Sequence, residues 1–148
     1  MHLSTVFLVF LPTVAFGYSA TFDIQHTKQA HDLMILLKDS IDLDQIDALD
    51  AFVDPKFTWD GCKEVLGYAE YVRMLKIYSS AKAMNTNWSL DDSGTHMKES
   101  VLYFTIRHNY RKLAYYPDLH FEAKPFGKNG AYILTRGKSD RCGKLEEN

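Results

Sequence analysis

The spacing of apolar residues changes once along this chain, near Ala81, and that change restricts the fold more than any other feature. Before it, apolar residues recur every three or four positions, as in amphipathic helices; after it, they alternate with polar residues, as in strands with one buried face. The chain has 148 residues, of which 46% are hydrophobic. This length and pattern predict one α+β domain, with helices first and a mainly antiparallel sheet after them.

Three helices are expected, over residues 27–40, 43–52 and 64–80. Asp42 or Asp44 is the expected cap of the second helix, and an Asp-Pro pair at 54–55 ends it. The positions expected to be buried are Ala30, Leu33, Met34, Leu37, Ile41, Ile46, Leu49, Val53, Tyr68, Tyr71, Val72, Leu75 and Tyr78.

Five strands are expected, over residues 56–60, 84–90, 97–111, 112–126 and 131–138. Turn residues at 91–94 and 127–130 separate some of them. Alternation predicts two buried rows on the later strands. These are Leu102, Phe104 and Ile106, and Leu119, Phe121 and Ala123.

The first seventeen residues are typical of a signal peptide. Residues 2–17 contain no Asp, Glu, Lys or Arg, and the apolar run at 6–16 is interrupted by Pro12 and is short for a membrane span. We expect cleavage after Gly17, which leaves a secreted domain of residues 18–148 without a membrane segment. An uncleaved anchor or a buried N-terminal strand is the alternative.

The expected secretion predicts the chemical state of the two cysteines. In an oxidising compartment Cys62 and Cys142 are expected to form a disulfide, and their isolated positions predict no metal site. Asn87 begins the one Asn-x-Ser/Thr sequence and is a possible glycosylation site. A net charge of −2 does not favour binding to nucleic acid.

Two segments resemble a known superfamily. The run IDLDQIDALDAFVDPKFTWDG at 41–61, followed by GYAEY at 67–71, resembles the nuclear-transport-factor-2-like proteins, which include SnoaL-like cyclases and ketosteroid isomerases. With its leader and two cysteines, the chain looks most like the small secreted members found in nematodes. The resemblance implies a cone-shaped fold, whose cavity is closed by the first helix. It also implies a dimer through the outer sheet face, with Tyr103, Tyr115 and Tyr116 as candidates.

The resemblance also gives candidate catalytic residues. Ketosteroid-isomerase-like enzymes carry an aspartate base at the end of the first strand, where Asp60 stands in this chain. The simpler interpretation, which the residues favour, is that Asp60 and Gly61 form an exposed turn at the strand end. The oxyanion donors of those enzymes correspond to Met34 and to Leu119, or to Asp118 with a one-residue slip. Methionine and leucine donate no hydrogen bond, so isomerase chemistry of that type is not expected.

Histidines offer another pairing, because SnoaL-like cyclases use a histidine with an aspartate. His108 is in phase with the buried row of its strand, whereas His120 is opposite Leu119 and Phe121, so the two are not expected in one cavity. His96 is expected at a solvated turn. No hydrolase or phosphate-loop motif is present, and no cofactor is expected.

These observations predict a secreted, non-enzymatic domain that binds a small apolar ligand or a protein partner, and the resemblance implies a homodimer. The expected ligand contacts are Trp59, Tyr103, Met34 and Leu119. The alternative is an isomerase or cyclase that uses Asp60 as base and His108 as its partner. A structural protein with no ligand is a third possibility.

Overall fold

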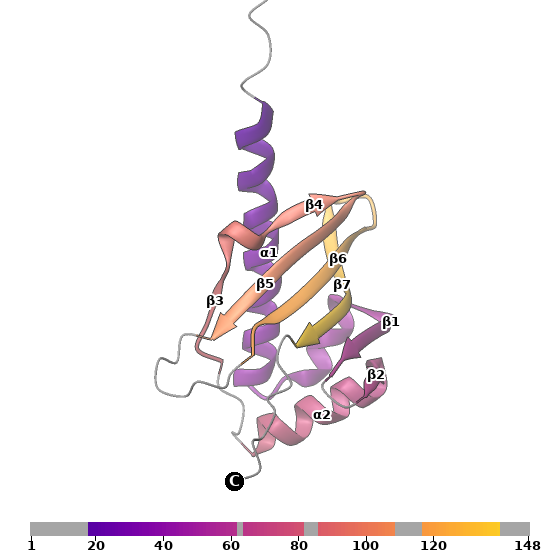
Figure 1. Ribbon diagram of the computed structural model, residues 1–148. Coiled ribbons are helices and arrows are strands. Elements are labelled where there is room, and N and C mark those ends of the chain that lie inside the picture. The colour runs from indigo at the N-terminus through magenta and orange to yellow at the C-terminus, as the bar shows by residue number, and fades with distance from the viewer. Residues whose placement is uncertain (1–17, 62–63, 82–85, 109–116, 140–148) are drawn as a thin grey trace, which may run out of the picture.

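A computed structural model describes residues 18–61, 64–81, 86–108 and 117–139, with side chains from Ile24 onward (Figure 1). The expected signal peptide, Cys62, Cys142, Tyr115 and Tyr116 lie outside these ranges. The helices are α1 (Tyr18–Asp42) and α2 (Tyr68–Ser80), with short 3-10 helices η1 (Ile46–Ala51) and η2 (Asp92–Gly94). The strands are β1 (Val53–Asp60), β2 (Val65–Gly67), β3 (Trp88–Leu90), β4 (His96–Lys98), β5 (Val101–His108), β6 (Leu119–Phe126) and β7 (Ala131–Ser139).

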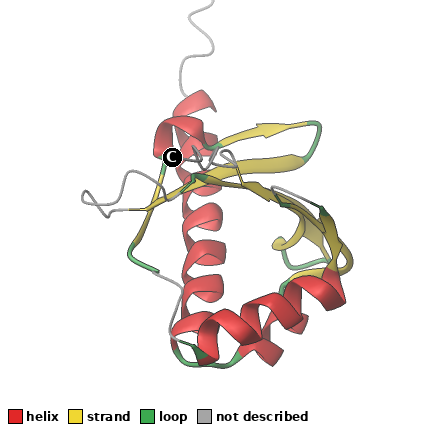
Figure 2. Cartoon of the chain, turned by 60° about the horizontal axis from the view of Figure 1, so that its bottom comes forward, coloured by secondary structure: helices red, strands yellow, loops and turns green. Residues whose placement is uncertain are grey.

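All seven strands form one sheet in the order β2-β1-β7-β6-β5-β3, with β4 also paired to β5. The β1–β7 pair is parallel and the other pairs are antiparallel. Figure 2 shows the sheet curving around one side of the molecule while α1 and α2 cover its inner face. The predicted α+β class and the curved, mainly antiparallel sheet are therefore confirmed.

Helix α1 supplies the centre of the core. The predicted stripe of Ala30, Leu33, Met34, Leu37 and Ile41 is buried, each with at most 4% of its surface exposed. The helix packs across β3, β4, β5 and β7, and α2 packs against β1. The helix begins earlier than expected, at Tyr18. The apolar stripe thus predicted the buried face correctly but not the N-terminal extension.

The second and third predicted helices need correction. Residues 46–51 form a 3-10 helix whose N-cap is Gln45, not Asp42 or Asp44. Asp44 instead adopts a positive φ of 55° and accepts a hydrogen bond of 2.7 Å from the hydroxyl of Ser79 in α2. Asp42 accepts hydrogen bonds from Lys38 and Thr86. Both carboxylates are therefore used to connect elements, so neither caps the short helix.

Helix α2 starts at Tyr68 because the residues before it form β2, which pairs with β1. The Glu70 carboxylate accepts a 2.8 Å hydrogen bond from the Gly67 backbone N–H, as in a capping box. Tyr71 and Leu75 are buried as expected, but Tyr78 is 46% exposed, so its predicted burial is wrong. Two α-helices and two short 3-10 helices therefore stand in the described ranges in place of three N-terminal helices.

The long strand predicted at 97–111 is divided into β4 and β5. Glu99 and Ser100 join them in a two-residue turn, with φ values of 50° and 65°. Such turns usually contain Asn or Gly, and their absence explains why the sequence pattern did not indicate a hairpin here.

A β-bulge in β7 decides which side chains face the core. Glu122 pairs with Arg136 and Ala123 with Leu134, which leaves Thr135 as the extra residue. The Thr135 hydroxyl donates a 3.2 Å hydrogen bond to the Glu122 carbonyl. Because of the extra residue, Leu134 and Gly137 both face the helices. Arg136 and its neighbour two positions on, Lys138, consequently face outward.

Gly137 allows two aromatic rings to pack on the sheet. Trp59 stacks on Tyr71 with ring centroids 5.2 Å apart and contacts Phe121 at 5.8 Å. A Cβ atom at position 137 would lie 2.6 Å from a Trp59 ring carbon and 3.0 Å from Phe121. The side chain of any other residue would therefore displace Trp59.

We expect Gly137→Ala to lower the free energy of unfolding by about 1–3 kcal/mol, because the added methyl overpacks the core. Urea denaturation followed by tryptophan fluorescence measures this change. In a Trp59→Leu background the same substitution should have a clearly smaller effect. Equal effects in the two backgrounds would mean that the Trp59 contact is not the cause.

Candidate functional site

Three of the predicted ligand contacts are core residues. Met34, Trp59 and Leu119 are 4%, 8% and 7% exposed and belong to the cluster between the helices and the sheet. Met34 and Leu119, which the resemblance matched to the isomerase donors, are packed among apolar side chains. Where the resemblance implied a cavity, these side chains form part of a packed core.

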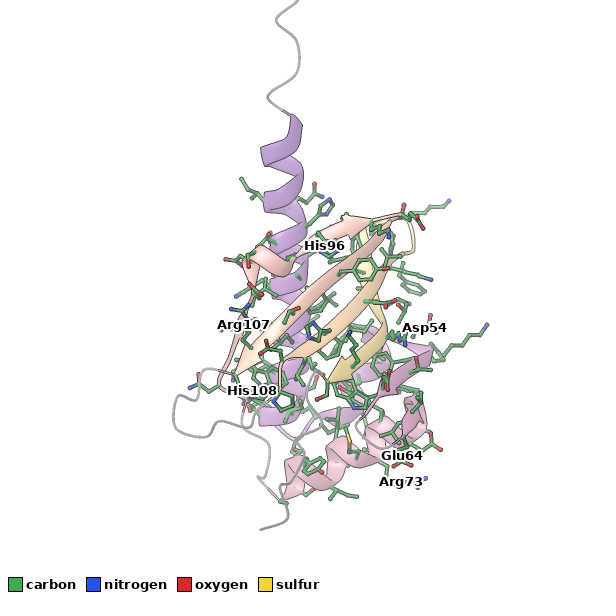
Figure 3. All side chains as sticks on the ribbon, viewed as in Figure 1. Asp54, Glu64, Arg73, His96, Arg107 and His108 are labelled. Carbon is green, nitrogen blue, oxygen red and sulfur yellow. The ribbon has the colours of Figure 1, made fainter. Side chains whose placement is uncertain are left out.

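Asp60 and His108 lie on opposite faces of the sheet, so the structure does not bring the predicted catalytic pair together. Asp60 follows the buried Trp59, faces outward, and has a side chain that is 47% exposed. His108 is in phase with the buried Ile106, and its ring meets the edge of Trp88 at 5.9 Å. Figure 3 shows His108 near the end of β5, away from His96 on β4.

The outward-facing residues form two rows across β5, β6 and β7. In the first row Tyr103 pairs with Glu122, which pairs with Arg136. In the second row Thr105 pairs with His120, which pairs with Lys138, and Asp60 continues this row on β1. A groove of about 250 Å³ runs over both rows, and Gly94 and His96 form its wall. We call it the outer groove.

Several contacts fix the side chains of the outer groove. The His96 and Tyr103 rings stack with centroids 5.2 Å apart, and His96 Nδ1 lies 3.0 Å from the Gly94 carbonyl oxygen. Thr105 Oγ1 and His120 Nδ1 are 2.8 Å apart. Arg136 lies between two carboxylates, 3.8 Å from Asp60 and 4.0 Å from Glu122. The outer groove therefore combines an aromatic end, a polar centre and a cationic end.

The sequence pattern predicts only part of this site. Tyr103, expected as a ligand contact, lines the outer groove rather than the core side. His96 is exposed as expected, but it belongs to β4 rather than to a turn, and it forms part of the groove wall. Alternation along β6 did place His120 and Glu122 on one face. The two cations of β7 were missed because the bulge at Thr135 changes the alternation.

The described titratable groups with a shifted pKa do not line the outer groove, although Asp91 is hydrogen-bonded to Gly94 at its wall. Burial raises the pKa of Tyr71, and burial together with a hydrogen bond to Asp50 raises that of Tyr68. For Asp42, burial raises the pKa, but hydrogen bonds from Lys38 and Thr86 outweigh burial and lower it overall. The hydrogen bond from the Ser93 hydroxyl lowers the pKa of Asp91, and the charge of Arg107 lowers it further. Together they outweigh desolvation, which acts in the opposite direction. These groups contribute to the folded structure rather than to a reaction centre.

A second groove, of about 550 Å³, lies over α2 and β2. Its apolar members Val65 and Ile77 are 65% and 63% exposed, and Glu64, Glu70 and Arg73 stand beside them. This surface is larger but does not have the paired rows and ring stacking of the outer groove. Across the described ranges, no group of three His, Cys, Asp or Glu residues is placed to hold a metal ion. None of the described helices is long and apolar enough to span a membrane.

Comparisons by sequence identify no relative, since no family model and no curated protein matches the chain. Solved structures do match. A protein with a cystatin-like fold from Caulobacter vibrioides has a TM-score of 0.57 and 9% identity, over 81% of this chain and 92% of that one. A nuclear-transport-factor-2-like protein of unknown function from Silicibacter pomeroyi has a TM-score of 0.54 and 10% identity, over 81% and 97%.

A de novo designed protein with a curved β-sheet is similar too, with a TM-score of 0.51 and 8% identity over 78% of this chain and 99% of that one. At such low identities the likeness concerns the backbone and does not extend to any activity. This chain therefore has the nuclear-transport-factor-2-like fold that its sequence resembles.

Proposed function

We propose that this protein is a secreted, non-enzymatic binding domain whose ligand occupies the outer groove. The observation that carries the proposal is the contrast between the two faces of the sheet. The helix-facing side is packed with large side chains, whereas the outer side has a groove lined by ring, hydroxyl, amine and carboxylate groups. The volume of the groove, about 250 Å³, is slightly below the usual range for drug-sized ligands, so it favours a ligand smaller than a typical drug.

The geometry supports binding better than catalysis. A general base and its partner need to reach one substrate atom, directly or through one water. Asp60 and His108 are separated by the thickness of the sheet, and Asp60 is instead 3.8 Å from Arg136. The hydrogen-bonded pair Thr105 and His120 serves in this proposal to hold the centre of the outer groove.

Secretion belongs to the same proposal, whereas self-association through the outer sheet face competes with it. The leader at 1–17 gives the extracellular location, and the exposed Asn87 is accessible to a glycosyltransferase. A homodimer through the outer sheet face would cover the outer groove, and so would a protein partner. Native mass spectrometry of the secreted protein separates these outcomes, because it reports the cleavage site, the glycan, the oligomer and any bound small molecule.

Chemical-shift mapping with a library of neutral aromatic fragments tests the location of the site. We expect fragments to shift the resonances of Tyr103, Thr105 and His120, while those of Met34 and Leu119 stay in place. Shifts centred on Met34 and Leu119 would instead favour a ligand beneath α1. If neither neutral nor anionic aromatic fragments shift either set, or if a dimer interface covers the outer groove, the proposed small-ligand function is wrong.

A further inference from the structure

The cationic end of the outer groove comes from two residues of one strand. Arg136 and Lys138 are two positions apart on β7 and face the same way, so their Cα atoms are separated by about 6.8 Å. The bulge at Thr135 is what turns them outward. Two long cationic side chains at this spacing can approach the two oxygens of one carboxylate.

The donors of these cations are not taken up by hydrogen bonds within the described ranges. Arg136 nitrogens are 3.8 Å and 4.0 Å from the Asp60 and Glu122 oxygens, longer than the roughly 2.7–3.2 Å of N–H···O hydrogen bonds. The N–H groups of the planar guanidinium are therefore available to hydrogen-bond another acceptor. In the same ranges, Lys138 forms neither an ion pair nor a side-chain hydrogen bond.

The opposite end of the outer groove is aromatic. His96 and Tyr103 stack with an interplanar angle of 12°, which holds both rings in place beside the sheet. Tyr103 lies two strands from Arg136 in the same row, a distance of about 10 Å. A flat apolar group would find contact surface here, while a charged group attached to it reached β7.

Glu122 stands between the two ends and limits the strength of an anion site. Its carboxylate competes for Arg136, which it approaches at 4.0 Å, and it repels a second negative charge. Removing that charge should therefore strengthen the binding of an acid. This expectation distinguishes an acid site from a general loss of structure.

We infer that the outer groove binds an aromatic carboxylic acid, with the carboxylate between Arg136 and Lys138 and the ring against His96 and Tyr103. The inference rests on the proposed function and specifies its ligand class. The required length, from β7 to the wall formed by β4, corresponds to a ring separated from its carboxylate by a short chain.

The probe for the test is 3-phenylpropanoate, titrated into the secreted protein and followed by chemical shifts of the outer-groove residues. A ligand of this size should bind with a Kd of about 1 mM. Two analogues test the contributions of the carboxylate charge and of the ring separately. The neutral 3-phenylpropanamide lacks the charge and propanoate lacks the ring, and each should bind at least about fivefold more weakly.

Substitutions test which residues of the outer groove contact the ligand. Arg136→Gln and Lys138→Gln should each weaken 3-phenylpropanoate binding by about fivefold to tenfold, since each removes a charge-assisted hydrogen bond. Glu122→Gln should strengthen binding by about twofold to threefold. The matched control is Lys124→Gln, which removes the same charge from an exposed position on β6 outside the outer groove and should leave Kd unchanged.

The outcomes separate the two proposals. If the acid and the amide bind the outer groove equally, the inference is overturned while the proposed function stands. If Lys124→Gln weakens binding as much as Lys138→Gln, the effect is one of overall charge and the inference is again overturned. If neither these probes nor the neutral fragments shift outer-groove resonances, both proposals are wrong.

Discussion

Replacing Trp59 by alanine should lower the free energy of unfolding by about 3–5 kcal/mol. Trp59 is 8% exposed and contacts Tyr71 and Phe121 by ring stacking or tilted packing, while Gly137 lies beneath its ring. The truncation removes buried apolar surface and leaves a cavity between β1, β6 and α2. Because the rigid sheet cannot collapse into that space, the loss should be near the upper end of the range.

Urea or guanidinium denaturation measures the loss, with circular dichroism as the probe because the substitution removes a fluorophore. Phe126→Ala is the control, since Phe126 is 59% exposed at the end of β6 and should change stability by no more than about 0.5 kcal/mol. If Trp59→Ala were no more harmful than Phe126→Ala, the tryptophan would not be a core residue. A ligand site beneath α1 would then become credible again.

Removing the predicted disulfide between Cys62 and Cys142 should lower stability by up to about 4–5 kcal/mol, since it closes a loop of about 80 residues. The cysteines lie outside the described residues, but the strands that precede them support the pairing. Asp60 of β1 pairs with Lys138 of β7, and the two strands are parallel neighbours. Because the strands are parallel, β1 and β7 end on the same side of the sheet, two residues before Cys62 and three residues before Cys142 in the sequence.

Thiol titration of the denatured, unreduced protein should find no free thiol. Cys62→Ser, Cys142→Ser and the double variant should then lose the same free energy of unfolding, because each removes the same cross-link. Two free thiols in the unreduced protein would refute the disulfide. Unequal losses in the three variants would show that the serine substitutions act through local packing instead.

The sequence predicted the features of the fold that depend on neighbouring residues. The apolar stripe of α1 and the alternating faces of β5 and β6 follow from helical and strand periodicity, so their buried residues could be identified. The turn at 127–130 could also be predicted from neighbouring residues, because glycines favour turns. Gly127 and Gly130 both adopt positive φ there.

Features that depend on distant contacts could not be predicted in this way. Asp42 and Asp44 looked like helix caps, but Thr86 and Ser79 from later segments bind their carboxylates. The outer groove depends on the register of three strands, and alternation along one strand does not give the register of the next. The pairing of Asp60 with His108 was implied by the resemblance to the cyclases, whereas Lys138 is the residue that lies beside Asp60 in the sheet.

The extra residue at Thr135 has a consequence for how relatives of this protein should be aligned. In a homologue that lacks the extra residue, the counterparts of Arg136 and Lys138 would still pair with Glu122 and His120 and face outward. Loss of that residue would thus shift the alternation of core and surface residues by one sequence position without changing the fold. An alignment that ignores this one position would compare groove residues with core residues along the rest of the strand.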